Sequence, residues 1–312
     1  MQKIIAVVGP TATGKSDLGV LLAKKFNGEI ISADSRQVYK GMDIGTGKIT
    51  KKEMLGVKHH LLDIASPKTT FNAIKFKKQA EAKIKEIASR GKLPILVGGT
   101  GFWIDAVAFN QSFPDVPPNP ELRKKLNQLP AEKLFNILKK LNPERAQNID
   151  WQNKRRVIRA IEIARGSKRP KKSKGLTANS APNSAAATVP KLKYQTLFIG
   201  LDMPDEVLTK KITTRLDKRL KQGMVKEVEK LHKNGVSWQK LDEFGLEYRF
   251  VAQYLQNQIS KQQMRELLLI AVRNYSKRQR TWFKRNKEII WLNPTDKTTK
   301  KAAYTASSEF LA

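Results

Sequence analysis

Short runs of consecutive apolar residues, many of them β-branched, recur through the first and last thirds of the chain. They lie at residues 3–8, 29–32, 93–97, 194–201 and 288–292. Stretches between them repeat apolar residues every three or four positions, as residues 71–90 do before Gly91. The runs predict buried strands, and the longer stretches predict amphipathic helices. Because strands separated by helices form parallel sheets, we predict an α/β fold whose sheet is flanked by helices.

The pattern changes at residue 113, where prolines become frequent and strands disappear. Three short amphipathic helices are predicted at residues 121–128, 131–141 and 151–164. The small and polar residues of 166–190 cannot bury enough surface to order themselves, which predicts a mobile loop. We therefore expect an α/β core at 1–112, an all-helical insertion at 113–193, a return to the core at 194–294 and a frayed tail at 295–312.

Charge narrows the choice of partner. Sixty Lys and Arg residues against 28 Asp and Glu give a formal net charge of +32. A field of this size attracts polyanions, so a nucleic acid is favoured, although charge does not distinguish DNA from RNA. The chain has no cysteine, which excludes thiolate metal sites and indicates a reducing compartment. No run approaches the roughly 20 apolar residues of a membrane span, so we expect a cytoplasmic protein, and we expect a monomer.

A phosphate-binding motif follows the first predicted strand. It has the spacing G-x-x-x-x-G-K-S and comprises Gly9, Pro10, Thr11, Ala12, Thr13, Gly14, Lys15 and Ser16. Backbone N–H groups of such a loop face an anion, the lysine adds a positive charge, and the serine hydroxyl is placed to bind Mg²⁺. The motif predicts a P-loop NTPase-like core. It leaves open whether the bound group is the γ-phosphate of a nucleotide or a diphosphate that leaves.

Two further stretches follow predicted strands. Asp34 comes just after the second strand, and Thr100 comes after the third, in the sequence Gly98-Gly99-Thr100-Gly101. Parallel sheets bind ligands at the carboxyl ends of their strands, so both side chains can face the ligand of the phosphate loop. The local sequence of Asp34 fits three roles: a metal ligand, a general base and an ordinary turn residue. Thr100 fits either a ligand-binding hydroxyl or a helix cap.

These stretches and several others together resemble the bacterial tRNA dimethylallyltransferase family. The matching segments are GPTATGKS at 9–16, ADSRQVYKGMDIGTGK at 33–48, HHLLDI at 59–64, VGGTGFWI at 97–104, KRRVIRAIE at 154–162, GLEYR at 245–249 and RNYSKRQRTWF at 273–283. The resemblance spans nearly the whole chain. It implies transfer of the dimethylallyl group from dimethylallyl diphosphate to the exocyclic N6 amine of the adenosine 3′-adjacent to the anticodon in tRNA. Diphosphate is then the leaving group.

The resemblance also implies roles for individual residues. Asp34 is then the base that accepts the amine proton, with Thr100 beside it and Lys15 on the diphosphate. Arg215 and Arg219 are candidates for a second diphosphate clamp, between which the sequence does not choose, and Ser16 would bind Mg²⁺. The implied tRNA-binding residues are Asp34, Ser35, Arg36, Gln37, Thr100, Arg123, Arg155, Arg156, Val157, Ile158 and Arg159.

The helix predicted at 260–285 interleaves aromatic and basic residues. Tyr275 and Trp282 are seven positions apart, which favours a buried stripe, and the basic residues then face tRNA. Three other functions remain open from the residues themselves. They are a small-molecule kinase or NTPase, a prenyltransferase acting on free adenine nucleotides, and an RNA-binding protein without catalysis.

Overall fold

Six parallel strands form one sheet in the computed structural model, which describes residues 1–166 and 193–312. The strands are β1 (Lys3–Val8), β2 (Gly28–Ser32), β3 (His59–His60), β4 (Leu93–Val97), β5 (Gln195–Leu201) and β6 (Ile290–Leu292). Their order is β3-β2-β4-β1-β5-β6. The first strand therefore lies in the centre, paired with β4 on one side and with β5 on the other. The predicted parallel α/β fold is confirmed.

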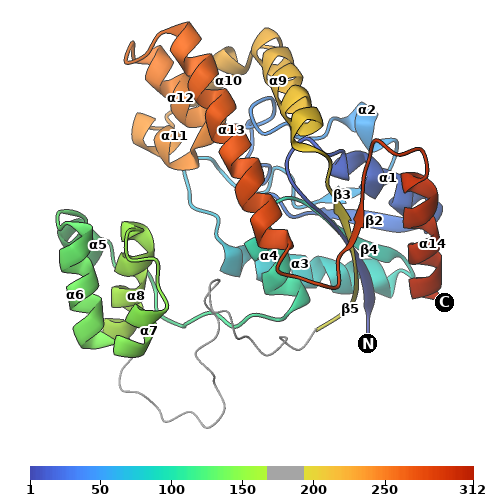
Figure 1. Ribbon diagram of the computed structural model, residues 1–312, viewed down its shortest axis with the longest axis horizontal. Helices are drawn as coiled ribbons and strands as arrows, with labels where there is room; N and C mark the ends of the chain where they lie inside the picture. The colour runs from blue at the N-terminus through green and yellow to red at the C-terminus, as the bar shows by residue number, and fades with distance from the viewer. Residues whose placement is uncertain (167–192) are drawn as a thin grey trace. The chain divides into compact units, whose positions relative to one another are not determined.

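Apolar side chains cover both faces of the sheet, as the uninterrupted apolar runs predict. Alternate residues of β1 enter different clusters, so that Ile4 packs on one face and Ile5 on the other. The helices α1 (Lys15–Lys25) and α14 (Thr299–Leu311) cover the Ile5 face. The opposite face packs against α3 (Ala73–Ser89) and α4 (Gly101–Ala108) (Figure 1).

The remaining helices of this unit follow β5, apart from one short helix after β2. They are α2 (Lys51–Met54), α9 (Asp205–Lys221), α10 (Met224–Lys233), α11 (Trp238–Phe244), α12 (Leu246–Leu255) and α13 (Lys261–Phe283). The longest helix, α13, packs against α9, α12 and α4 (Figure 1). One helix thus links the group of helices after β5 with the helix that begins beside Thr100.

A second compact unit comprises residues 111–191, and the first comprises 1–110 and 192–312. The helices of the second unit are α5 (Pro120–Asn127), α6 (Ala131–Leu141), α7 (Pro143–Gln147) and α8 (Lys154–Gly166). They enclose a small core that includes Leu134, Leu138, Val157 and Ile161. The described part of this unit contains helices and no strand, and α7 is a helix that the sequence pattern did not predict.

The prediction of a frayed tail at 295–312 is wrong, because residues 299–311 form α14. Ala303 of this helix is fully buried, and the ring of Tyr304 meets that of Phe26 edge-on with centroids 6.2 Å apart. The helix is stabilised by packing on α1 although its own sequence is rich in Ser, Thr and Lys. The predicted loop at 166–190 lies outside the described residues, except for Gly166, which ends α8.

Candidate active site

The phosphate loop connects the carboxyl end of β1 with α1. Gly9 has φ +134°, and a Cβ at this position would lie 2.3 Å from the carbonyl oxygen of Leu201 on β5. Only glycine allows the chain to turn so close to the neighbouring strand. Gly14, also at positive φ, precedes the first helical residue, Lys15. The loop therefore presents the amino-terminal end of α1, which favours anions.

Lys15 is held against its own loop. Its Nζ donates a hydrogen bond to the carbonyl oxygen of Pro10 at 2.6 Å. Burial, together with the positive charge of Arg215, lowers the pKa of Lys15 to about 7, although Asp34 acts in the opposite direction. The negative charge of Asp34 is therefore too weak to offset burial and Arg215, and a phosphate group would add the negative charge that favours the protonated amine.

Two arginines of α9 approach the site in different ways. Arg215 donates from Nη2 to the Thr11 hydroxyl at 2.6 Å, so it contacts the phosphate loop itself. Burial, followed by the neighbouring charge of Arg219, lowers its pKa, although a guanidinium stays charged near neutral pH. Arg219 instead donates to the Gly45 carbonyl at 3.0 Å and to Glu247 at 3.2 Å. Of the two candidate clamps, Arg215 is the one bonded to the loop.

Asp34 follows β2 and is fixed by backbone hydrogen bonds. Its Oδ1 accepts from the amides of Arg36 at 2.8 Å and Gln37 at 3.3 Å. The amide of Ser35, the residue between Asp34 and Arg36, donates to the Thr100 hydroxyl oxygen at 3.0 Å. The loops after β2 and β4 are thus joined, and they bring Asp34 and Thr100 to the same end of the sheet, as the sequence predicts.

A cavity of about 1080 Å³ lies over these strand ends. Its lining includes Lys15, Ser16, Asp34, Gln37, Arg215 and Arg219. Ser35, Arg36 and Thr100 are not among the lining residues and lie beside Asp34. Arg36 donates from Nε to the Phe244 carbonyl at 2.8 Å, which ties this segment to α11. One cavity therefore combines cationic groups for a phosphate chain with a carboxylate.

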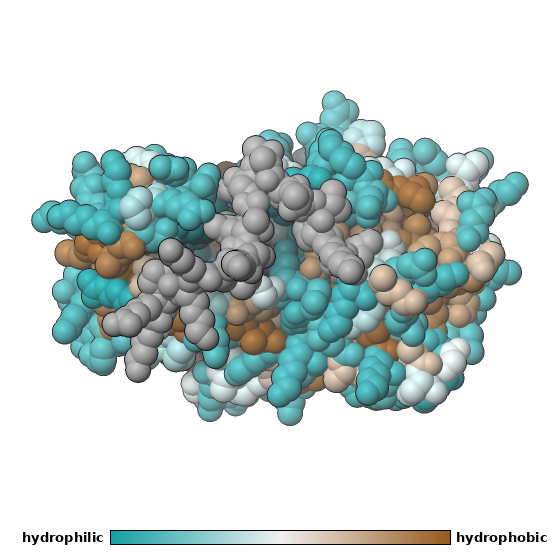
Figure 2. Space-filling model, turned by 90° about the horizontal axis from the view of Figure 1, so that it is seen from below, coloured by the Kyte–Doolittle hydropathy of each residue, from teal (hydrophilic) through white to brown (hydrophobic). Residues whose placement is uncertain are grey.

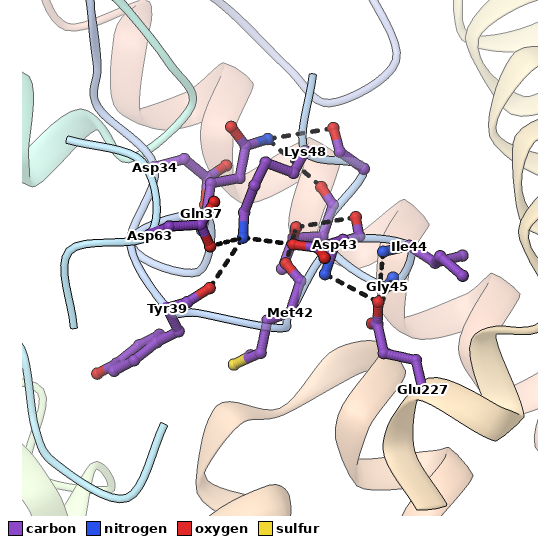
Figure 3. A network of polar contacts seen from close by, with 12 residues as sticks. Asp34, Gln37, Tyr39, Met42, Asp43, Ile44, Gly45, Lys48, Asp63 and Glu227 are labelled. Atoms are coloured by element: carbon purple, nitrogen blue, oxygen red, sulfur yellow. Dashed lines mark hydrogen bonds and ion pairs between the residues drawn. The ribbon is translucent and has the colours of Figure 1, made fainter. Parts of the chain in front are cut away.

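The wall formed by residues 43–48 is held by two charged residues that sequence reasoning missed. Lys48 donates to the Tyr39 carbonyl at 2.9 Å and pairs with Asp43 at 2.6 Å and Asp63 at 2.5 Å (Figure 3). Glu227 of α10 accepts from three successive backbone amides, those of residues 43, 44 and 45, at 2.6 to 3.0 Å. Glu227 lies about 180 positions away in the sequence, so no local pattern could have identified it.

The basic residues predicted on the helical unit divide into two groups. Arg123 and Arg159 bond to the buried Glu162 at 2.7 and 3.2 Å. Burial would raise the pKa of Glu162, but hydrogen bonds from Arg123, the Asn119 amide and Arg159 hold it below its ordinary value. These two arginines therefore stabilise the unit.

Arg155 and Arg156 are exposed, and Arg156 lies 3.7 Å from Asp150. Val157 and Ile158 are 0% and 4% exposed in the core of the helical unit. The prediction of tRNA contacts is therefore wrong for their side chains, because the apolar face of an amphipathic helix is the face that packs inward. Arg155 and Arg156 remain the solvent-facing candidates of α8.

The described residues show neither a ready-made metal site nor a membrane span. In the ranges 1–166 and 193–312, no three His, Asp or Glu side chains are grouped so as to hold a metal ion. Within the same ranges, no helix has the length and apolar character needed to cross a bilayer.

The sheet order, the phosphate loop and the cavity define a P-loop α/β protein whose cavity places cationic side chains beside a carboxylate. A family model described as IPP transferase matches residues 37–286. The tRNA dimethylallyltransferase 1 of Syntrophus aciditrophicus is 41% identical in an alignment of 303 positions that covers 95% of this chain and 95% of that one. The chain therefore belongs to the IPP transferase family, which includes the tRNA dimethylallyltransferases.

Solved structures agree with this assignment. The tRNA isopentenylpyrophosphate transferase of Bacillus halodurans is 35% identical, with a TM-score of 0.72 over all of this chain and 97% of that one. A eukaryotic dimethylallyltransferase acting on tRNA is 26% identical, with a TM-score of 0.81 over all of this chain and 80% of that one. The resemblance drawn from the sequence motifs is confirmed.

Proposed function

We propose that the protein transfers the dimethylallyl group from dimethylallyl diphosphate to the N6 amine of the adenosine 3′-adjacent to the anticodon in tRNA. The observation that carries the proposal is that Lys15, Arg215 and Asp34 meet at one cavity. Family membership supports it, since relatives are named tRNA dimethylallyltransferase and a similar structure is described as acting on tRNA. A non-catalytic RNA-binding protein would leave the phosphate loop and Asp34 without a role, and a kinase does not account for the names of the relatives.

The cationic end of the cavity suits a diphosphate that leaves. When the allylic C–O bond breaks, negative charge grows on the departing oxygen. Loop amides, Lys15 and the Arg215 guanidinium on Thr11 are already in place to stabilise that charge. The catalytic effect follows because these groups interact more strongly with the developing charge than with the intact ester.

The acceptor needs a base. As the adenine N6 forms its bond to the allylic carbon, the amine loses a proton and the diphosphate takes the electron pair of the broken C–O bond. Asp34 Oδ1 is occupied by two amides, so in this proposal Oδ2 accepts that proton. Thr100, joined to the same turn through the Ser35 amide, lies beside the acceptor end.

The oxygen donors at the loop fit a magnesium ion carried by the diphosphate. Ser16, the second residue of α1, lines the cavity, as does Asp34, and hydroxyl and carboxylate oxygens are hard ligands suited to Mg²⁺. Mg²⁺ commonly binds through one or two protein ligands and substrate phosphates. When bound, the ion would neutralise charge on the diphosphate.

The tRNA partner agrees with the charge of the chain. A net charge of +32 favours a polyanionic substrate, and hydrophilic residues cover much of the face shown in Figure 2. The anticodon stem-loop is the expected binding region, with the exposed Arg155 and Arg156 as candidate phosphate contacts. We expect the protein to act as a monomer, which light scattering at assay concentration would test.

A labelling experiment tests the function. Dimethylallyl diphosphate labelled in its prenyl group is incubated with the protein, Mg²⁺ and one of three acceptors: unmodified tRNA, AMP or ATP. We expect label only in tRNA, and nuclease digestion should place it on the adenosine 3′ to the anticodon. A matched tRNA transcript with guanosine at that position should remain unlabelled. Label in AMP or ATP would instead identify a prenyltransferase of free nucleotides.

A further inference from the structure

The buried side chain of Gln279 joins two loops of the site. Its Oε1 accepts from the Thr11 amide of the phosphate loop at 2.8 Å, and its Nε2 donates to the Gly99 carbonyl at 2.9 Å. Gln279 is only 6% exposed. One side-chain amide on α13 therefore spans the gap between the loop after β1 and the loop after β4.

The surroundings leave this side chain little freedom. A Cβ at position 99 would lie 2.1 Å from Gln279 Nε2, so the contact requires the glycine. Thr11 is held from a second direction, because Arg215 donates to its hydroxyl at 2.6 Å. Three residues after Gln279, Trp282 donates from Nε1 to Asp105 of α4 at 2.8 Å. The same face of α13 thus fixes the phosphate loop, the loop before Thr100 and the helix after it.

We propose that Gln279 is a positioning residue that sets the separation between the diphosphate and the acceptor ends of the active site. The inference rests on the proposed function, in which the phosphate loop holds the donor and the Gly98–Thr100 turn supports the acceptor. Reacting atoms must approach to about 3–3.5 Å, and a displacement of about 1 Å costs roughly 100-fold in rate. A side chain that is hydrogen-bonded to both loops would act on that distance.

Two substitutions of Gln279 distinguish positioning of the two loops from a purely space-filling role of the side chain. Gln279→Met keeps the length and volume of the side chain but removes both hydrogen bonds. Gln279→Asn keeps the amide but is one methylene too short to reach both loops. Gln262→Met, on an exposed position of the same helix, is the matched control.

We expect both Gln279 variants to lower kcat about 10- to 100-fold. KM for tRNA and the affinity for inorganic diphosphate, measured by calorimetry, should change less than about threefold, because each loop keeps its own ligand groups. Gln262→Met should match the unsubstituted protein. Thermal melting identifies which variants are folded.

The proposal is overturned if either folded variant retains full kcat, or if the loss appears in KM and diphosphate affinity instead of kcat. It is also overturned if activity falls only in proportion to the folded fraction in both variants. An unsubstituted protein that fails to label tRNA would refute the proposed function itself. The two failures are therefore distinguishable.

Discussion

The Asp34 carboxylate is held through Oδ1 by two backbone amides, and in the proposed mechanism Oδ2 accepts the proton. We predict that Asp34→Asn lowers kcat by about 10²- to 10⁴-fold, because the amide keeps the shape and one acceptor oxygen but cannot take up the proton. Single-turnover labelling of tRNA measures the effect. The affinity for tRNA, measured in parallel, should change little.

The opposite result would reassign the residue. If Asp34→Asn kept the full kcat but abolished Mg²⁺-dependent binding of the donor, Asp34 would be a metal ligand. The base would then have to be another group of the cavity lining.

The lowered pKa of Lys15 predicts that binding of a diphosphate is linked to uptake of a proton. Its pKa of about 7 in the free protein means that the amine is mostly neutral at pH 8. A bound diphosphate favours the charged form and raises that pKa, so binding at pH 8 should take up close to one proton. Affinity should accordingly fall as pH rises above 7, by up to about tenfold per pH unit.

Calorimetry in two buffers of different ionisation enthalpy measures this uptake for dimethylallyl diphosphate. Lys15→Met is the control, because its side chain cannot gain a proton. Subtracting the proton uptake of this variant from that of the unsubstituted protein removes the contribution of protons released by the ligand. Equal proton uptake by both proteins would show that Lys15 is already charged before binding.

At the residue scale, the sequence predicted groups that lie in one motif or at one sheet edge. Lys15 and Asp34 were identified because a contiguous loop and the end of a strand mark them. The sequence does not mark Gln279 as a site residue, because Tyr275 and Trp282, at i−4 and i+3 from it, indicate a buried apolar stripe. Its two partners are 268 and 180 positions away, and such distant pairings leave no local pattern.

At the scale of elements, the loop of residues 43–48 depends on a carboxylate from α10. We predict that Glu227→Ala lowers the free energy of unfolding by about 1–3 kcal/mol, since three backbone amides and the Tyr248 hydroxyl then have no acceptor. Glu229→Ala on the same helix removes only an exposed pair with Lys233 and should leave that free energy almost unchanged. Urea unfolding compares the two. Equal effects would contradict the bracing role of Glu227.

Whole elements were predictable where local patterns were strong. The strands β1, β2 and β4 and the helix α13 were recognised within a few residues, because apolar runs and capping residues mark them. The helix α14 was missed because its own sequence favours a helix weakly. Contacts with α1, such as Tyr304 on Phe26, supply its stability, and they cannot be read from the helix alone.

At the scale of the whole molecule, the charge of +32 predicts tRNA binding that weakens steeply with salt. Arg155→Ala combined with Arg156→Ala should flatten the plot of log affinity against log salt by roughly one unit for each arginine that binds a phosphate. Lys139→Ala with Lys140→Ala, on exposed positions of α6 in the same unit, is the control. An unchanged slope would make Arg155 and Arg156 ordinary solvated residues.

The place of β1 in the sheet has a consequence for the chain as it leaves the ribosome. β1 pairs with β4 early, but its other neighbour, β5, follows the 111–191 unit. At ~5–20 residues per second, that unit takes roughly 4–16 s to synthesise. If β1 has paired with β4 by then, its other edge, along Ile4, Ile5, Ala6, Val7 and Val8, is unpaired during this interval and is a template for incorrect strand pairing. We therefore expect this edge of β1 to need protection until residues 195–201 emerge and pair with it.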